Sequence, residues 1–414
     1  MKTYKNFLLE KNIPTKIPIP KDIEQIAKLF HDAGKDLFVV GGAVRDFLQG
    51  KTPHDYDIVT NALPEESKRI LHYQCMYNKG WNVSDEQGKN FGVLRIYTKD
   101  EPLGYELATY RKDISKGRDV KGEEQKVEIG PHITINDDVK RRDLTINALF
   151  YDINNKKIVD LVGGIDDIKN NVIRAIGNPK ERFNEDRLRI LRVFRFAART
   201  GGKIDPVTSE AIKSDNRLRG IGSKDDVSQE RIHEEWNKML EHAQKADSPK
   251  MMQDYVDLLT EYDMWKQMFP GMRIDLSGEI EFLDNALIFH GLFKKDDIGG
   301  KRKLLVQTLK FPINLVNKLD FIESYLISQE NEYNDVYKLA KLKEKYHIDD
   351  DLILMVVDEY GLNIEFAESF IKYCNDGFVV DGNDLMAQGF KNKDIEKEKE
   401  RRELLRFKNE YIQL

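Results

Sequence analysis

The sequence predicts an α+β fold in which a mixed α/β head comes first and a long helical part follows. Short apolar or alternating runs, which are typical of strands, end at about residue 161. From about residue 165 onward, apolar residues recur almost only at helical spacing. At 414 residues the chain is also too long for one compact core, so we expect two to four units. These features indicate a mixed sheet with helices, followed by an all-helical part.

The expected elements of the head follow from local patterns. A helix over residues 23–30 is predicted by apolar residues at helical spacing, with Gly34 as a cap. The apolar run at residues 37–40 ends at a glycine pair, which indicates a buried strand. Similar patterns predict further strands at residues 93–97, 105–110, 149–152 and 157–161. The polar, glycine-containing stretch 111–137 is expected to be a mobile loop next to a site.

A phosphate-binding corner is predicted where the first strand ends, at residues 41–46 (GGAVRD). Gly42 would let the backbone approach a ligand closely, and a helix beginning near Val44 would favour an anion. Arg45 adds a planar fork suited to phosphate oxygens. The same residues also suit an ordinary strand–turn–helix corner, so the corner by itself does not establish a site.

A pair of carboxylates follows ten residues later. Asp55 and Asp57 would point to the same face of an extended strand, because side chains alternate along a strand. Two such carboxylates can bind Mg²⁺, which prefers carboxylate and phosphate oxygens. A two-metal site of this kind clamps the attacking and leaving oxygens of an in-line displacement. Beside the glycine corner, this favours a metal site over two solvated acids.

Two later segments are rich in arginine. Residues 141–149 (RRDLTINAL) combine guanidinium groups with an acid and an amide, which suits a triphosphate and ribose hydroxyls. In residues 185–196, Arg189, Arg192 and Arg195 recur every three residues, so they would share one helical face, with Asp186 one further step back. An acid beside an arginine can imitate the pairing edge of a base. Either segment is also compatible with a charged helix end or a solvated basic face.

Composition excludes several classes of protein. The net charge of −6 gives no global positive field, so any RNA contact must use a local basic patch. Cys75 and Cys374 lack Cys or His neighbours, which argues against zinc and disulfides and fits a reducing compartment. No apolar run approaches the roughly 18 residues of a membrane span, and the first ten residues do not resemble a signal peptide. We therefore expect no membrane contact, no obligate protein partner, and a location in the cytoplasm or an organellar matrix.

Taken together and in this order, the motifs resemble those of the class II tRNA nucleotidyltransferase and bacterial poly(A) polymerase family, whose catalytic head is like that of DNA polymerase β. The match is highly specific as a set and covers roughly residues 20–240, at segments 41–46, 55–57, 141–148, 176–183, 185–189 and 228–231. The resemblance implies a nucleotidyltransferase head over 1–162, a helical neck with a base-binding helix over 163–240, a helical body over 241–330, and a helical tail over 331–414 that contacts tRNA.

The resemblance also implies a role for each matching residue. Asp55 and Asp57 would bind Mg²⁺ and carry the catalysis, with Glu106 as a third candidate carboxylate on a strand facing the pair. Asp186 and Arg189 would pair with the base of CTP or ATP. The full set of nucleotide-binding residues would be Gly42, Arg45, Arg142, Asp143, Asp186, Arg189, Arg192 and Arg195.

The implied activity is the addition of CCA to the 3′ end of tRNA from CTP and ATP, and the alternative within the family is poly(A) tailing. Residues 381–389 resemble the tail-end motif of CCA-adding members, and the chain ends in alternating Lys and Glu rather than in the basic extension of poly(A) polymerases. Two other classes stay open at this point: a non-catalytic RNA-binding relative, and a nucleotidyltransferase acting on small molecules. The intact Asp55, Asp57 and Arg45 argue against the first. The long helical part argues against the second.

Overall fold

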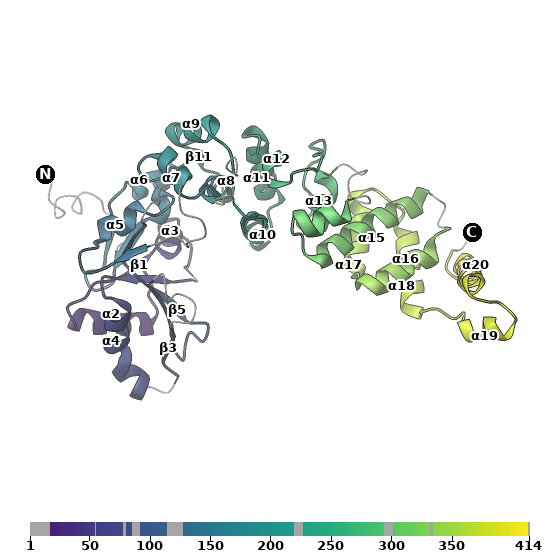
Figure 1. The fold of residues 1–414 in the computed structure, drawn as a ribbon, viewed down its shortest axis with the longest axis horizontal. Helices are drawn as coiled ribbons and strands as arrows, with labels where there is room; N and C mark the ends of the chain where they lie inside the picture. Colours follow the sequence, from purple (N-terminus) through teal and green to yellow (C-terminus); the bar gives the residue numbers. More distant parts are fainter. Residues whose placement is uncertain are drawn as a thin grey trace. The chain divides into compact units, whose positions relative to one another are not determined.

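The computed structural model describes residues 17–53, 55–77, 80–84, 92–113, 127–218, 227–293, 301–330 and 334–412. The chain divides into two compact units, residues 1–227 and 228–414. The expected head and most of the expected neck lie in the first unit, which Figure 1 shows in purple to teal. The finer division into four parts stays a prediction.

A mixed sheet forms the centre of the first unit. In the part that the structure describes, its seven strands lie in the order β3-β4-β5-β2-β1-β8-β9. Strands β2 and β5 are parallel, and the other neighbours are antiparallel. The strands are β1 (Leu37–Val40), β2 (Asp57–Thr60), β3 (Asn82–Ser84), β4 (Val93–Tyr97), β5 (Tyr105–Thr109), β8 (Leu149–Asp152) and β9 (Lys157–Asp160). All strands predicted from the sequence are therefore confirmed.

Each face of the sheet has its own apolar core, because alternate residues of a strand point to opposite faces. Helices α2 (Lys21–Asp32) and α4 (Pro64–Tyr77) pack against one face, where Leu37, Val39 and Ile58 are buried. The predicted helix is confirmed as α2, with Gly34 at a positive φ of 71° just after its end. The other face carries Phe38, Val40, Val59 and Phe150, and it packs against α5 (Ile135–Lys140). This second face is the one on which the site is built.

The prediction of a loop over residues 111–137 is wrong at both ends of this range. Strand β6 (Arg111–Asp113) pairs antiparallel with β7 (Val127–Ile129), and α5 begins at Ile135. Residues 114–126 lie outside the described part of the chain. Strand β6 contains no apolar residue, and β7 alternates over only three residues, which is too short for a recognisable strand pattern.

Short elements connect the sheet to the helices that follow it. These are η1 (Thr145–Asn147), α6 (Gly164–Lys169), β10 (Val172–Ile173), α7 (Pro179–Glu185), α8 (Leu188–Thr200), β11 (Lys203–Ile204) and α9 (Pro206–Ser214). Strands β10 and β11 pair with each other, so this region is helical with a small two-stranded exception. Gly164 lies so close to η1 that an added Cβ would be 2.2 Å from the carbonyl oxygen of Thr145.

The second unit is helical, as predicted. Its helices are α10 (Gln229–Lys245), α11 (Pro249–Glu261), α12 (Trp265–Met268), α13 (Asn285–Leu292), the π-helix η2 (Leu304–Thr308), α15 (Ile313–Glu330), α16 (Val336–Tyr346), α17 (Asp350–Glu359), α18 (Ile364–Asp376), α19 (Gly382–Ala387) and α20 (Lys393–Glu410). An aromatic cluster holds the early helices together, with Trp236 stacked on Phe289 at 4.7 Å between ring centroids. No helix in the described ranges is long and apolar enough to cross a membrane.

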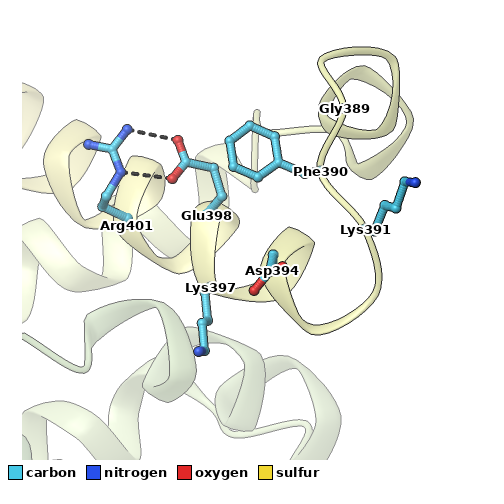
Figure 2. Close-up of a pocket in the computed structure, with 7 residues that line it drawn as sticks. All are labelled: Gly389, Phe390, Lys391, Asp394, Lys397, Glu398 and Arg401. Carbon is cyan, nitrogen blue, oxygen red and sulfur yellow. Dashed lines mark hydrogen bonds and ion pairs between the residues drawn. The ribbon is translucent and has the colours of Figure 1, made fainter.

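The tail segment combines surface charge with a buried anchor. An open hollow of 460 Å³ lies beside the turn between α19 and α20, where Glu398 pairs with Arg401 and Phe390 faces the opening (Figure 2). Farther along α20, Glu403 is fully buried and accepts hydrogen bonds from the backbone amides of Val379 and Val380, each at 2.8 Å. The alternating Lys and Glu residues of α20 thus lie on a mostly exposed face, while Glu403 and Phe407 anchor its buried face.

Asp160, at the end of β9, connects the sheet to α6, and it generates a stability prediction. Its buried carboxylate accepts hydrogen bonds from four backbone amides, those of residues 162–165, at 2.8–3.1 Å. Asp160→Ala leaves these amides without a partner, so we expect a loss of about 3 kcal/mol in the free energy of unfolding. Chemical denaturation followed by circular dichroism measures this loss. The control Asp166→Ala, on the exposed side of α6, should change stability by less than about 0.5 kcal/mol. Equal effects of the two substitutions would contradict the assignment.

Candidate functional site

The predicted strand–glycine–helix corner is present. Strand β1 ends at Val40, Gly41 adopts a positive φ of 75°, and helix α3 (Gly42–Leu48) begins directly after it. A side chain at Gly41 would be strained in this conformation, which explains the glycine. The helix begins two residues earlier than the sequence suggested, so Gly42 is its first residue.

Arg45 points into the protein from α3. Its side chain is almost fully buried, and its guanidinium group donates to Asp46 Oδ1 at 2.9 Å and to Asn147 Oδ1 at 2.6 Å. The same group lies over the ring of Phe196, 5.1 Å from the ring centroid. Arg45 therefore joins α3 to η1 and to α8.

The network continues from Asn147 to the second arginine-rich segment. Asn147 Nδ2 donates to Asp143 Oδ1 at 3.4 Å, and Arg192 Nε donates to Asp143 Oδ2 at 2.7 Å. Burial by itself would raise the pKa of Asp143, but the charge of Arg192 outweighs this and holds the pKa below its ordinary value. At the other end of the network, Arg199 Nη2 lies 3.4 Å from Asp46 Oδ2. Motif residues that are distant in the sequence thus meet in one chain of contacts, which we call the arginine network (Arg45, Asp46, Asp143, Asn147, Arg192 and Arg199).

Several guanidinium groups of this region surround one aromatic ring. The carbons at the centres of the Arg45, Arg192 and Arg195 guanidinium groups lie 5.1, 5.8 and 4.5 Å from the centroid of the Phe196 ring. Burial and the positive charge of Arg45 lower the pKa of the neighbouring Arg199. This crowding of like charges favours an anion.

Asp57 and Glu106 form a row with Arg95 on the same face of the sheet. The register of β2, β5 and β4 places Glu106 beside Asp57 and Arg95 beside Glu106, and Arg95 Nη2 lies 2.6 Å from Glu106 Oε1. Asp55 precedes β2 by two residues, so the expectation that both aspartates lie on the strand is wrong for Asp55. The row confirms that Asp57 and Glu106 share a face. The catalytic role of Glu106 stays a prediction.

The carboxylates repel one another. Burial and the negative charge of Glu106 raise the pKa of Asp57, Asp55 adds to this, and Arg142 opposes it. A divalent cation would relieve the repulsion, and carboxylate oxygens are suitable ligands for it. In the described ranges no group of three or more His, Cys, Asp or Glu side chains is arranged to hold an ion. Asp55 and Asp57 fit a divalent metal ion in charge and in donor type.

Arg142 lies on this face next to the carboxylates. Its guanidinium group is 5.1 Å from the centroid of the Phe150 ring, and Phe150 is in register with Val40, the β1 neighbour of Asp57. Asp138 of α5 accepts hydrogen bonds from Arg142 Nε at 3.1 Å and Nη2 at 2.9 Å. A positive charge is thus held near the site predicted for the metal.

The segment predicted to read the base differs in one respect from its prediction. Helix α7 ends at Glu185 and α8 begins at Leu188, so Asp186 lies between two helices and not on the face of α8. Its Oδ1 accepts a hydrogen bond from the amide of Leu188 at 3.1 Å. Arg189 is buried, and its guanidinium group contacts Glu185 Oε2 at 2.7 Å and the carbonyl oxygen of Arg141 at 2.9 Å.

Comparisons with known proteins identify the family. Residues 37–174 match the model of the poly A polymerase head domain. The CCA-adding enzyme of Ligilactobacillus salivarius is 36% identical over 281 residues, which are 68% of this chain and 62% of that protein. The chain belongs to the family of class II tRNA nucleotidyltransferases and bacterial poly(A) polymerases. Members of this family generally use divalent metal ions.

The relatives include members of both branches of this family, the CCA-adding enzymes and the poly(A) polymerases. Poly(A) polymerase I of Escherichia coli O6:H1 is 32% identical over 267 residues, which are 63% of this chain and 52% of that protein. The chain thus spans between half and two thirds of the length of these curated relatives. The solved structure of the Thermotoga maritima CCA-adding enzyme with tRNA has the same fold, with a TM-score of 0.63, 20% identity, and coverage of 99% of this chain and 96% of that one. The predicted fold class and family are confirmed.

Three residues that organise this candidate site were not among the predicted site residues: Asp46, Asp138 and Asn147. Asp46 lies inside a motif but had no assigned role, the amide of Asn147 was expected to suit a ribose hydroxyl and not to contact Arg45, and Asp138 lies outside the motifs. One signal was available for Asp138, which precedes Arg141 and Arg142 by three and four residues, the spacing of helical neighbours.

The contact between Asp143 and Arg192 gives a testable prediction. Asp143→Asn removes the charge from a half-buried ion pair that also carries a hydrogen bond, so we expect it to destabilise the first unit by about 1.5–3 kcal/mol. The matched control is Asp32→Asn, which breaks an exposed pair with Lys28 and should cost less than about 1 kcal/mol. Urea denaturation of the two variants measures the difference. A loss as small as that of the control would show that Arg192 does not depend on Asp143.

Proposed function

We propose that this chain adds CCA to the 3′ end of tRNA, using CTP, ATP and Mg²⁺. The observation that carries the proposal is the meeting of two kinds of group in the first unit: a row of repelling carboxylates, and an arginine network that extends to α8. The first kind suits metal ions and the second suits a triphosphate. Both are needed for nucleotidyl transfer.

The arginines would bind the nucleotide through its phosphates. Arg192 and Arg195 lie with Arg45 around Phe196, and an incoming triphosphate would lower the repulsion among them. Gly42 leaves the backbone of α3 accessible, because a Cβ there would meet little besides Arg45 Nη2, at 3.6 Å. Asp143 would hold Arg192 in place for this contact.

The carboxylates would organise the reacting oxygens. Mg²⁺ bound by Asp55 and Asp57 would lower the pKa of the RNA 3′-OH and neutralise charge on the triphosphate. In the reaction, a bond forms between the 3′ oxygen and the α-phosphorus, and the bond from that phosphorus to the bridging oxygen breaks. Pyrophosphate leaves with the bonding electron pair, and the 3′-OH loses its proton. Arg142 would stabilise the negative charge that gathers on the phosphate oxygens.

Asp186 and Arg189 would select the base. A carboxylate accepts from an exocyclic amine and a guanidinium donates to ring acceptors, a combination that fits the pairing edge of C or A. Asp186 is half-buried at the start of α8, where its position is fixed by the amide of Leu188. Arg189 lies one turn farther on, and its buried guanidinium is fixed by Glu185.

The acceptor is proposed to be tRNA because several observations favour CCA addition. The CCA-adding enzyme of L. salivarius is a relative at 36% identity, and the likeness to the T. maritima enzyme with tRNA extends over 99% of the chain. The terminal helix α20 pairs acids with bases, as in Lys341–Glu396 and Glu398–Arg401, so its surface is not uniformly basic. Poly(A) tailing is the second candidate, favoured by the 32% identity to the E. coli poly(A) polymerase.

The reducing environment indicated by two free cysteines fits the cytoplasm.

The central prediction concerns incorporation of nucleotides into tRNA that lacks its last three residues. The wild-type chain should add two C from CTP alone, and C, C and A from CTP with ATP. Asp57→Asn should lower the rate by more than the roughly 10- to 100-fold typical of losing a supporting group, because it removes a metal ligand. Asp100→Asn, in an exposed turn, is the control and should retain activity. Long A tracts made from ATP alone would favour tailing, and full activity of Asp57→Asn would refute the metal assignment.

A second prediction concerns the choice of base. Asp186→Ala should weaken the discrimination of CTP and ATP against UTP and GTP by about 10-fold or more, because one hydrogen-bonding partner of the base is lost. Glu181→Ala, on the exposed side of α7, serves as control and should keep the selectivity of the wild type. Ratios of kcat/KM for the four nucleotides give the result. Unchanged ratios in Asp186→Ala would mean that the base is read elsewhere.

A further inference from the structure

Asp138 is a fully buried carboxylate close to the site, and the nucleotidyl-transfer scheme above does not use it. It belongs to the short helix α5 and accepts hydrogen bonds from two consecutive arginines. The distance from its Oδ1 to Arg141 Nε is 2.8 Å, and its Oδ2 contacts both Nε and Nη2 of Arg142 at 3.1 and 2.9 Å. The amide of Arg111 also points at Oδ1, at 3.4 Å.

This arrangement has no advantage for stability that an apolar core would lack. Removing a carboxylate and two guanidinium groups from water costs several kcal/mol per charge, and well-packed apolar residues often stabilise a core at least as well. The contacts of Asp138 do fix the direction of the Arg141 and Arg142 guanidinium groups. A carboxylate that accepts hydrogen bonds from two guanidinium groups leaves each of them little rotational freedom. Burial by itself would raise the pKa of Asp138, but Arg142 and Arg141 outweigh this and hold it low, so the carboxylate stays charged.

The two arginines connect different parts of the site. Arg142 lies over Phe150, and its charge acts on Asp57. Arg141 offers its carbonyl oxygen to Arg189 Nη2 at 2.9 Å, and the preceding carbonyl, that of Lys140, accepts from Arg182 Nη1 at 2.7 Å. The end of α5 therefore contacts α7 and α8, and Arg142, two residues after this helix, acts on Asp57 through its charge.

We infer that Asp138 is a positioning residue for nucleotidyl transfer: it aims Arg142 at the phosphate beside Asp57 and fixes the end of α5 on which Arg189 docks. This inference rests on the proposed function. Asp138 touches neither the nucleotide nor the reacting atoms and acts through Arg142. It thereby fixes the spacing between the metal side and the base side of the site.

The test is a double-mutant cycle on addition of C to tRNA that lacks CCA. Asp138→Asn keeps the shape of the side chain but removes its charge, and kcat should fall about 10- to 100-fold, as for other supporting groups. Arg142→Gln should cause a similar loss. The double variant should be no slower than Arg142→Gln within about threefold, because a residue that acts through Arg142 has no effect once Arg142 is absent. Losses that multiply would overturn the inference.

Two further variants separate positioning from folding. Asp137→Asn alters the neighbouring residue, whose carboxylate accepts from the backbone amide and the hydroxyl of Thr134 and caps α5, and it should leave kcat within about twofold. Asp138→Glu keeps the charge and should recover part of the lost kcat, and it replaces Asp138→Asn in the cycle if that variant does not fold by circular dichroism. Equal losses in Asp137→Asn and Asp138→Asn would assign Asp138 a merely structural role.

The activity of the wild-type chain distinguishes a failure of this inference from a failure of the proposed function. Failure of the wild type to extend any RNA would refute the proposed function. Calorimetric titration with CTP and Mg²⁺ then tests the positioning, with weaker binding expected in Asp138→Asn and unchanged binding counting against the inference. An active wild type with an equally active Asp138→Asn would overturn the positioning role and leave the proposed function standing.

Discussion

The first unit is organised by the need to pair guanidinium groups that are fully or partly buried: Arg45 and Arg189 are buried, and Arg142 and Arg192 are partly exposed. Arg45, Arg142, Arg189 and Arg192 each find a carboxylate or carbonyl oxygen on another part of the fold. Because an unpaired buried charge is very costly, each contact fixes the position of the element that supplies it. The glycine corner, the 3₁₀ turn η1, and helices α5 and α8 are held together in this way. The apolar cores on the two faces of the sheet stabilise these elements but do not specify their contacts with one another.

The same contacts explain how one region can provide for two chemical needs. The strand register places Asp57 and Glu106 side by side, where their charges repel. Two positive charges act on this pair from within the protein: Arg142, held by Asp138, and Arg95, which is paired with Glu106. The arginine network leads away from it to α8, where positive charge accumulates around Phe196. A cation on one side and a polyphosphate on the other would each relieve a repulsion already built into the fold.

Much of this arrangement could be predicted from the sequence, because the strands and the glycine corner have strong local patterns. The motifs of residues 141–148 and 185–196 were correctly expected to come together with the first two. Helical spacing, however, placed Asp186 on α8, whereas the chain breaks between α7 and α8. Asp55 was expected on a strand that begins only at Asp57. The pairing of β6 with β7 depends on contacts between separate segments, which periodicity does not report. Helical spacing does indicate the contacts of Asp138 with Arg141 and Arg142, but it does not report the contacts of these two arginines with Phe150 and Arg189.

The most direct test of this account is a crystal structure of the chain with CTP, Mg²⁺ and tRNA that lacks its terminal CCA. The account predicts that the triphosphate lies between α3 and α8, with Mg²⁺ on Asp55 and Asp57. The cytosine edge should contact Asp186 and Arg189, and the 3′-OH should face the α-phosphorus. A nucleotide bound away from the arginine network, or a metal that leaves Asp57 uncoordinated, would contradict it.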